Sequence, residues 1–173
     1  MTKLKRILHI EGIKQKVFLF LINKVFVGTN VKYFDIKRKL LNSIGYVIGE
    51  GTKVVGPIEC TGKLIVGKNC WIGKNLKING NGSVYIGNNC DIGPEVTFQT
   101  GGHMIGSEER RAGKGCIFTQ KIGDGTWIGG RSTFLNDTVI GKGCVIAGGA
   151  CVVKDVENNT LVGGVPAVKI KRL

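Results

Sequence analysis

The sequence predicts an all-β protein, a parallel β-helix built from hexapeptide repeats. From Ile48 onward an apolar residue recurs at every sixth position, and glycine often follows it directly. A period of six fits neither an amphipathic helix, near 3.6, nor a half-buried strand, near 2. The 173 residues include 28 glycines but only three prolines, and the glycines do not fall at every third position. This composition indicates many tight turns between short strands within one domain.

Residues 1–45 form a basic segment that precedes the repeat. They contain ten Lys or Arg against two acidic residues, which is +8 of the net charge of +13. The longest apolar run, 17–22, is too short to cross a bilayer, and no small-x-small cleavage site follows it. We expect either a short helical or irregular cap on one end of the repeat domain, or a basic amphipathic element, residues 1–40, on an anionic membrane. No nucleic acid is expected as a partner, because no nucleic-acid-binding motif accompanies the charge.

Residues 46–160 are expected to form the β-helix, because the six-residue period runs through them in two series. Two extra residues in AsnGlyAsnGly (79–82) separate the series. Three hexapeptides make one triangular turn, so each inward residue should stack on the residue 18 positions later. The tail, residues 161–173, is expected to cover the C-terminal end, since solenoid ends expose unpaired backbone. The predicted inward residues are Ile48, Val54, Cys60, Val66, Ile72, Ile78, then Ile86, Ile92, Phe98, Met104, Ile122, Ile128, Phe134, Ile140, Ile146 and Val152.

The period is interrupted at about residues 101–120. Met104 and Ile122 are 18 residues apart, so by spacing alone a whole coil could lie between them. The intervening GlySerGluGluArgArgAlaGlyLysGly (106–115) is too polar to bury a stack of side chains. We therefore expect a loop that leaves the coil, with His103 at its base.

Six cysteines stand at 60, 70, 90, 116, 144 and 151, without any Cys-x-x-Cys pair. Most occupy places where another repeat would carry a small apolar residue. This pattern indicates reduced, partly buried thiols in a cytoplasmic protein rather than disulfides or metal ligands. No metal is expected. His9, the second of two histidines, stands between apolar neighbours and is expected to be structural or exposed.

From about Val84 to its end, the chain resembles the hexapeptide-repeat acyltransferases, notably the maltose/nodulation, serine acetyltransferase-like and bacterial polysaccharide O-acetyltransferase types. The repeat alone is unspecific, whereas ThrGlyGlyHis, TrpIleGlyGly and GlyValProAla together are more specific. The resemblance implies a left-handed β-helix that assembles as a homotrimer, with acetyl-CoA and an acceptor bound between neighbouring subunits. The matching residues are IleGlyAsnAsnCys (86–90), ThrGlyGlyHis (100–103), LysIleGlyAspGlyThrTrpIleGlyGly (121–130), ValIleGlyLysGlyCysValIleAlaGlyGlyAla (139–150), ValLysAspVal (153–156) and GlyGlyValProAla (163–167).

His103 matches the general base of this family. An alcohol is a poor nucleophile toward a thioester, and a neutral imidazole can take its proton as the oxygen attacks. No nucleophilic Cys or Ser motif is present, which favours direct transfer over an acyl-enzyme. The group that orients His103 is left open: Asp91 and Glu95 are near only in sequence, Gly73 stands where the maltose-type pattern has Asn, and a backbone carbonyl could serve instead.

The resemblance also implies residues for the two substrates. Gly130 and Gly148, one coil apart, would let the pantetheine arm approach, although both could be ordinary turn glycines. Val153 and Lys154 follow in the next turn, and Lys171 is placed for the phosphates. Arg111, or its neighbour Arg110, could contact the acceptor or another subunit, or be a solvated charge. Trp127 precedes an inward residue and should project outward, into the acceptor site or a subunit interface.

The function expected is O-acetylation, by acetyl-CoA, of a hydroxyl on a sugar or surface-polysaccharide precursor, in the cytoplasm or at the inner membrane face. The polysaccharide assignment rests on the resemblance. Alternatives are acetylation of serine, an amino sugar or an antibiotic, and a non-catalytic scaffold. A γ-type carbonic anhydrase has the same fold but needs three zinc-binding histidines, and the chain has two.

Overall fold

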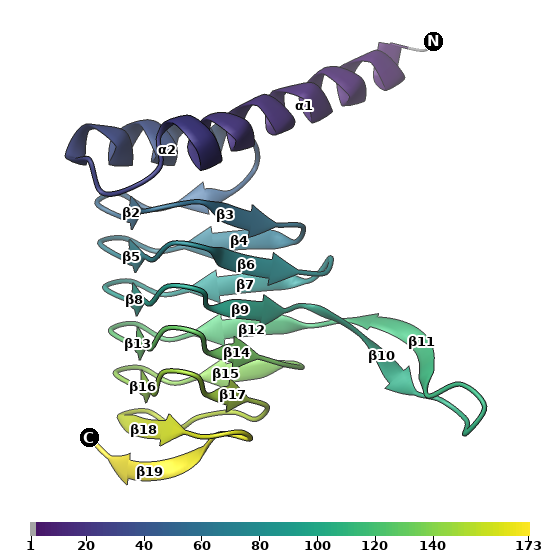
Figure 1. Ribbon diagram of the computed structural model, residues 1–173, viewed down its shortest axis with the longest axis vertical. Coiled ribbons are helices and arrows are strands. Elements are labelled where there is room, and N and C mark those ends of the chain that lie inside the picture. Colours follow the sequence, from purple (N-terminus) through teal and green to yellow (C-terminus); the bar gives the residue numbers. More distant parts are fainter. Residues whose placement is uncertain (1–2) are drawn as a thin grey trace.

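The computed structural model describes the backbone of residues 3–173 and the side chains of residues 12–173. Its main body is a parallel β-helix with two helices across the N-terminal end (Figure 1). The chain visits three sheets in a fixed order, so each coil is a triangle with three faces, which we call A, B and C. The predicted fold class is confirmed, and the N-terminal cap is helical.

The elements divide among the faces as follows. The N-terminal part consists of α1 (Lys3–Phe20), the π-helical turn η1 (Leu21–Val25) and α2 (Val31–Ser43). Face A contains β1 (Val47–Ile48), β4 (Lys63–Val66), β7 (Ser83–Ile86), β12 (Thr119–Ile122) and β15 (Thr138–Ile140). Face B contains β2 (Lys53–Val54), β5 (Trp71–Ile72), β8 (Asp91–Ile92), β13 (Trp127–Ile128), β16 (Val145–Ile146), β18 (Thr160–Gly163) and β19 (Val168–Arg172). Face C contains β3 (Ile58–Cys60), β6 (Leu76–Asn79), β9 (Thr97–Gln99), β14 (Thr133–Phe134) and β17 (Cys151–Val152). The predicted loop is a two-stranded hairpin, which consists of β10 (Gly101–Ile105) and β11 (Ala112–Ile117).

Strand register follows the predicted 18-residue spacing with two interruptions. Lys63 pairs with Ser83, a separation of 20, so the turn at 79–82 adds two residues as expected. Ser83 then pairs with Thr119, a separation of 36, because the hairpin lies between them. The hairpin therefore adds one coil's length of sequence without adding a coil.

Inward side chains stack into continuous columns that form the core. The rings of Phe98 and Phe134, on neighbouring coils of face C, are stacked with their centroids 4.7 Å apart. The prediction for Met104 was wrong: its side chain is 61% exposed, because the chain leaves the solenoid at Gly101. Ile122, buried beneath Ile86, fills the place that Met104 was predicted to take.

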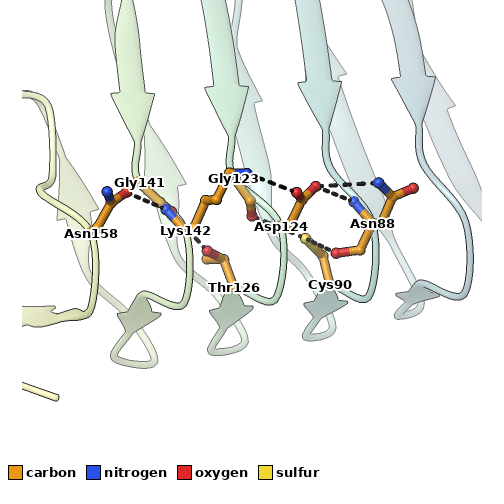
Figure 2. A network of polar contacts seen from close by, with 8 residues as sticks. All are labelled: Asn88, Cys90, Gly123, Asp124, Thr126, Gly141, Lys142 and Asn158. Carbon is orange, nitrogen blue, oxygen red and sulfur yellow. Dashed lines mark hydrogen bonds and ion pairs between the residues drawn. The ribbon is translucent and has the colours of Figure 1, made fainter.

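A ladder of polar side chains joins successive coils at the corner between faces A and B (Figure 2). Asp124 Oδ1 accepts from the backbone N–H of Asn88 at 2.8 Å, and Asn158 Oδ1 accepts from that of Lys142 at 2.8 Å. Lys142 Nζ lies 3.3 Å from Asp124 Oδ2. Just inside, the Cys90 thiol donates to the Gly123 carbonyl. These contacts satisfy backbone groups that the turn leaves without a strand partner.

The N-terminal helices close the first coil by imitating a missing strand. The side-chain amide of Asn23 donates to the Ile58 carbonyl and accepts from its N–H, at 2.8 and 2.9 Å. Asn42 makes the same pair of bonds with Ile48. Lys37, fully buried, donates to the Val55 carbonyl at 2.9 Å, and burial lowers its pKa to about 8. The open backbone edge of the solenoid is thereby satisfied.

The C-terminal end is covered by the chain doubling back. β19 pairs antiparallel with β18, which itself pairs in parallel with β16. The side chain of His9 belongs to a part of α1 outside the described side chains, so the prediction for it stays untested.

Candidate active site

The hairpin β10–β11 leaves the solenoid at the corner between faces C and A, which we call the C–A corner, and projects away from it (Figure 1). Its glycines permit close approach of the two strands. A Cβ on Gly113 would lie 3.0 Å from the Met104 carbonyl oxygen, and one on Gly102 would lie 2.8 Å from the Phe118 ring. The register, which pairs His103 with Gly115, shifts at a bulge between His103 and Ile105. Bulges of this kind re-aim side chains.

His103 has a fixed ring orientation although its side chain is exposed. Its Nδ1 lies 2.9 Å from the backbone carbonyl oxygen of Gly113, on the opposite strand of the hairpin. A carbonyl oxygen can only accept, so Nδ1 must carry the proton. In the neutral ring the lone pair is then on Nε2, which is the nitrogen left to accept a proton. The orienting group that the sequence left open is thus a backbone carbonyl.

Gln120 anchors the base of the hairpin from inside the solenoid. Its fully buried side chain occupies an inward position of face A. Nε2 lies 3.0 Å from the carbonyl of Gln99, 3.0 Å from that of Asn136 and 3.3 Å from that of Phe134. Gln99 ends the strand before the chain departs into the hairpin. Gln120 therefore ties the departure point to the next coil.

Arg111 lies at the tip of the hairpin rather than beside His103. Its guanidinium donates to the Gly106 carbonyl at 3.3 Å, and the Gly106 N–H donates back to the Arg111 carbonyl at 2.9 Å. These contacts close the tip. The neighbouring Arg110 side chain is exposed.

The structure divides the residues predicted for the site into two groups on opposite sides of one chain. The C–A corner faces away from face B across the triangular section. Only at the C-terminal end do the two sides approach each other, where Lys154 lines a hollow with Val162 and Lys169 of face B. The hairpin and the C–A corner hold His103, Arg111, Val153 and Lys154. Face B and the corner between faces B and C hold Trp127, Lys171, Gly130 and Gly148.

The two glycines that were predicted to bind the cofactor differ in their surroundings. A Cβ on Gly130 would lie 3.0 Å from the Pro94 carbonyl oxygen and 3.1 Å from its ring, so close packing of coils already requires a small residue there. Gly148 is exposed, and a Cβ on it would lie 3.3 Å from the Gly130 carbonyl. Gly148 is therefore the glycine that leaves the outer edge of this corner free of a side chain.

The basic residues near the C-terminus also differ. Lys171 and Lys154 are exposed, whereas Lys169 is 3.0 Å from Glu157 Oε2 and pairs with it. Lys169 is thus the less available of these cations for a phosphate. Gly73, where the resemblance would place an asparagine, has no room for one: its Cβ would lie 2.7 Å from Gly93.

Two residues that were given no role lie beside Trp127. Trp71, Asp91 and Trp127 follow one another across face B, in register, and line a surface hollow of about 440 Å³. Trp127 is 58% exposed, as its predicted outward direction requires. Trp71 and Asp91 also directly precede inward isoleucines, so the same reasoning, with the two-residue insertion counted, would have placed all three on one face.

No helix among the described residues is long and apolar enough to span a membrane. Within the same part of the chain, no three His, Cys, Asp or Glu side chains gather where they could hold a metal ion.

Comparison with known proteins supports this description. Residues 121–154 match the bacterial transferase hexapeptide (six repeats) family. The galactoside O-acetyltransferase of Escherichia coli is 30% identical over 139 residues, which cover 79% of this chain and 68% of that protein. A hexapeptide-repeat acetyltransferase of Vibrio cholerae, solved with acetyl coenzyme A, superposes with a TM-score of 0.80 at 25% identity, covering 95% of this chain and 88% of that one. A maltose O-acetyltransferase from Clostridium difficile gives a TM-score of 0.69 at 27% identity, covering 96% and 88%. With a matching repeat, a shared fold and a relative this similar, the chain belongs to the hexapeptide-repeat acetyltransferases.

Proposed function

We propose that this acetyltransferase moves an acetyl group from acetyl-CoA directly to a hydroxyl group of a sugar, with His103 as the general base. The observation that carries the proposal is the contact between His103 Nδ1 and the Gly113 carbonyl at 2.9 Å. It holds the ring in one tautomer and leaves Nε2 to receive a proton. Galactoside and maltose O-acetyltransferases are among the similar proteins, which supports a sugar as acceptor.

Nε2 of His103 takes the acceptor's hydroxyl proton as the oxygen bonds to the acetyl carbon and the carbon–sulfur bond breaks. The departing thiolate takes up a proton and is released as free CoA. A positioned base typically contributes about 10²–10⁴ in rate. The hairpin gives the required positioning, because the Gly113 carbonyl fixes the ring from the opposite strand. No acid is needed to orient it.

Acetyl-CoA supplies the acetyl group as an activated thioester. The features of the chain fit a long, phosphate-bearing ligand along the corner between faces B and C. The exposed Gly148 leaves this edge without a side chain, and the exposed Lys171 lies at the C-terminal end of face B. Val153 and Lys154 lie on the C–A corner, and Lys154 also lines a hollow with Val162 and Lys169 of face B, so it could contact the same ligand at the C-terminal end of one chain.

A site that uses both His103 and the hollow of face B needs at least two copies. The hairpin carries His103 away from its own solenoid, while the hollow between Trp71 and Trp127 lies on the opposite face. Met104, Ile105 and Ile117 expose apolar side chains along the hairpin, as a segment that packs on a neighbour would. We propose a homotrimer in which the hairpin of one copy reaches face B of the next, where Trp127 and Asp91 contact the acceptor.

The function is tested by incubating the protein with acetyl-CoA and a galactoside or maltose and measuring thiol release. Thiol should appear only when acceptor is present, and the product should carry an O-acetyl ester by NMR. Mass spectrometry of protein incubated with acetyl-CoA alone should detect no acetyl-enzyme. Transfer to serine or to an amine, but to no sugar hydroxyl, would refute the proposed acceptor; a chemically competent acetyl-enzyme would refute direct transfer.

The shared site is tested by mixing two variants. His103→Ala and Trp127→Ala proteins should each be weakly active, and trimers formed from both should regain activity because some sites receive both native residues. As a reference, His103→Ala is mixed with Lys114→Ala, a hairpin variant that we expect to be active. These mixed trimers contain at least one chain that has both His103 and Trp127. Mixed His103→Ala and Trp127→Ala trimers no more active than the separate variants would contradict a site built from two copies.

A further inference from the structure

The helix α1 has an apolar face that neither α2 nor the solenoid covers. Ile13, Val17 and Phe20 follow the three-and-four spacing of one helix face, and they are 50%, 48% and 59% exposed. On the other side of the same segment, Ile22 is fully buried and Leu19 packs against the core. The segment is therefore apolar on two sides, and the solenoid satisfies only one of them.

The orientation of this face is fixed by contacts made on the solenoid side. Lys14 Nζ donates to the Ser43 carbonyl at the end of α2, at 2.8 Å. Asn23 pairs with Ile58 of the first coil through two hydrogen bonds. Because these contacts hold one side of the segment against the molecule, the exposed side is turned away from it. α1 crosses the N-terminal end of the solenoid and extends beyond it (Figure 1).

The segment that carries the exposed face is basic. Residues 12–34 contain four lysines and no acidic residue, and the whole of residues 1–45 has a net charge of +8 from ten basic and two acidic residues. Lys16 and Lys24 are both exposed; Lys16 is next to Val17 in sequence, and Lys24 follows Phe20 by four residues and also lines a hollow with Glu59 of the first coil. Long lysine side chains beside a shallow apolar stripe can place their ammonium groups among anionic headgroups while the stripe enters the acyl boundary.

We propose that this outward face, formed by Ile13, Lys16, Val17, Phe20 and Lys24, docks the protein on an anionic lipid surface. A second copy of the chain fits the face less well, because it would bring the same positive charge against itself. Nucleic acid would match the charge, but it offers no apolar surface against which the stripe could be buried. An anionic bilayer satisfies both features, with the solenoid held outside the membrane.

The proposal is independent of the acetyl-transfer site, since none of its residues belongs to the hairpin or to face B. In a trimer with parallel solenoids, three such faces would point to one side of the assembly. Several weak contacts would then act together and strengthen binding without any new contact.

The test is co-sedimentation of the full chain with vesicles of phosphatidylcholine, with and without phosphatidylglycerol. We expect binding only to the anionic vesicles, and weaker binding as salt is raised. The double variant Val17→Ser/Phe20→Ser should lower the partition on the order of ten-fold, as should Lys16→Gln/Lys24→Gln. Matched controls are Leu173→Ser, an exposed apolar residue at the other end, and Lys68→Gln/Lys74→Gln, two exposed lysines of the solenoid.

The variants should keep the thermal unfolding midpoint and the acetyl-transfer rate measured without vesicles, so a loss of partition will report on docking alone. Equal binding to neutral and anionic vesicles, no binding by the native chain, or equal loss in the control variants would overturn the proposal. The proposal would also be overturned if the protein formed assemblies larger than a trimer without vesicles and Val17→Ser/Phe20→Ser broke them up. In that case a second copy of the chain, and not a lipid surface, would cover the exposed face of α1. Retention on a DNA duplex that depends on the same residues, without vesicle binding, would likewise overturn it.

Discussion

The solenoid coils and the hairpin that interrupts them are specified by different rules. In the coils, inward side chains on successive turns stack on one another, so the direction of a residue follows from its place in the six-residue period. In the hairpin, the placement of His103 depends on antiparallel pairing, a bulge and one glycine carbonyl. Repetition therefore gives this molecule its stability, and the hairpin, the longer of its two interruptions, gives it a histidine held in a defined orientation.

Because the hairpin and the coils are specified by different rules, we expect that the hairpin can be removed without unfolding the solenoid. This removal should lower activity more than any of the substitutions below. Deleting residues 101–118 would join Thr100 to Thr119 with the same number of residues as the next coil has between faces C and A. Acetyl transfer should fall by at least the ~10²–10⁴ that a positioned base supplies. Circular dichroism and the melting midpoint should stay close to the native values; a deletion variant that is unfolded would show that the two regions are not separable.

A core substitution should do the reverse and damage stability first. Phe134→Ala removes a fully buried ring that stacks on Phe98, and it should lower the free energy of unfolding by about 3–5 kcal/mol. Denaturant titration measures the change. Val47→Ala, at an exposed position of face A, should change the same quantity by less than about 0.5 kcal/mol. Equal losses in the two variants would refute the assignment of the core.

Gln120 joins the two regions, and its substitution should affect both, more modestly. Gln120→Leu leaves the carbonyls of Gln99, Phe134 and Asn136 without their buried donor, which should cost about 1–3 kcal/mol of unfolding free energy. Turnover should also fall, because the base of the hairpin is less firmly held. Gln99→Leu, at a half-exposed side chain on the same corner, is the control. A Gln120→Leu protein with native stability and turnover would show that Gln120 does not anchor the hairpin.

The smallest effect concerns the polar ladder in Figure 2, where the Asn88 N–H and then Lys142 lower the pKa of the exposed Asp124. The pKa of Asp124 is lower in the folded chain than in the unfolded chain, where it is about 3.9, so the ionised carboxylate stabilises the fold at pH values above the unfolded-state pKa. This contribution is lost as the pH falls through the folded-state pKa. Native protein and Asp124→Asn should therefore differ in melting midpoint at pH 7 and converge in acid. A difference that grows as the pH falls would contradict this sign.

The sequence predicted most of the fold because the aliphatic period, the turn glycines and the insertion at 79–82 each act locally. The prediction that Met104 points inward was wrong for a physical reason. Its position fits the six-residue period, but the chain has already left the coil at that point. The contact between His103 and Gly113 could not be predicted, since it depends on how two strands ten residues apart pair across a bulge. Trp71 and Asp91 could have been placed beside Trp127 from the period, but only the structure brings out the hollow that the three line.

His103 as the general base is tested most directly by the steady-state rate of acetyl transfer by His103→Ala, measured beside Lys114→Ala from the same hairpin. We predict that His103→Ala loses about 10²–10⁴ in kcat while retaining the native melting midpoint and assembly, and that Lys114→Ala remains close to native. A His103→Ala protein that is folded and turns over at a near-native rate would contradict the assignment of His103 as the base.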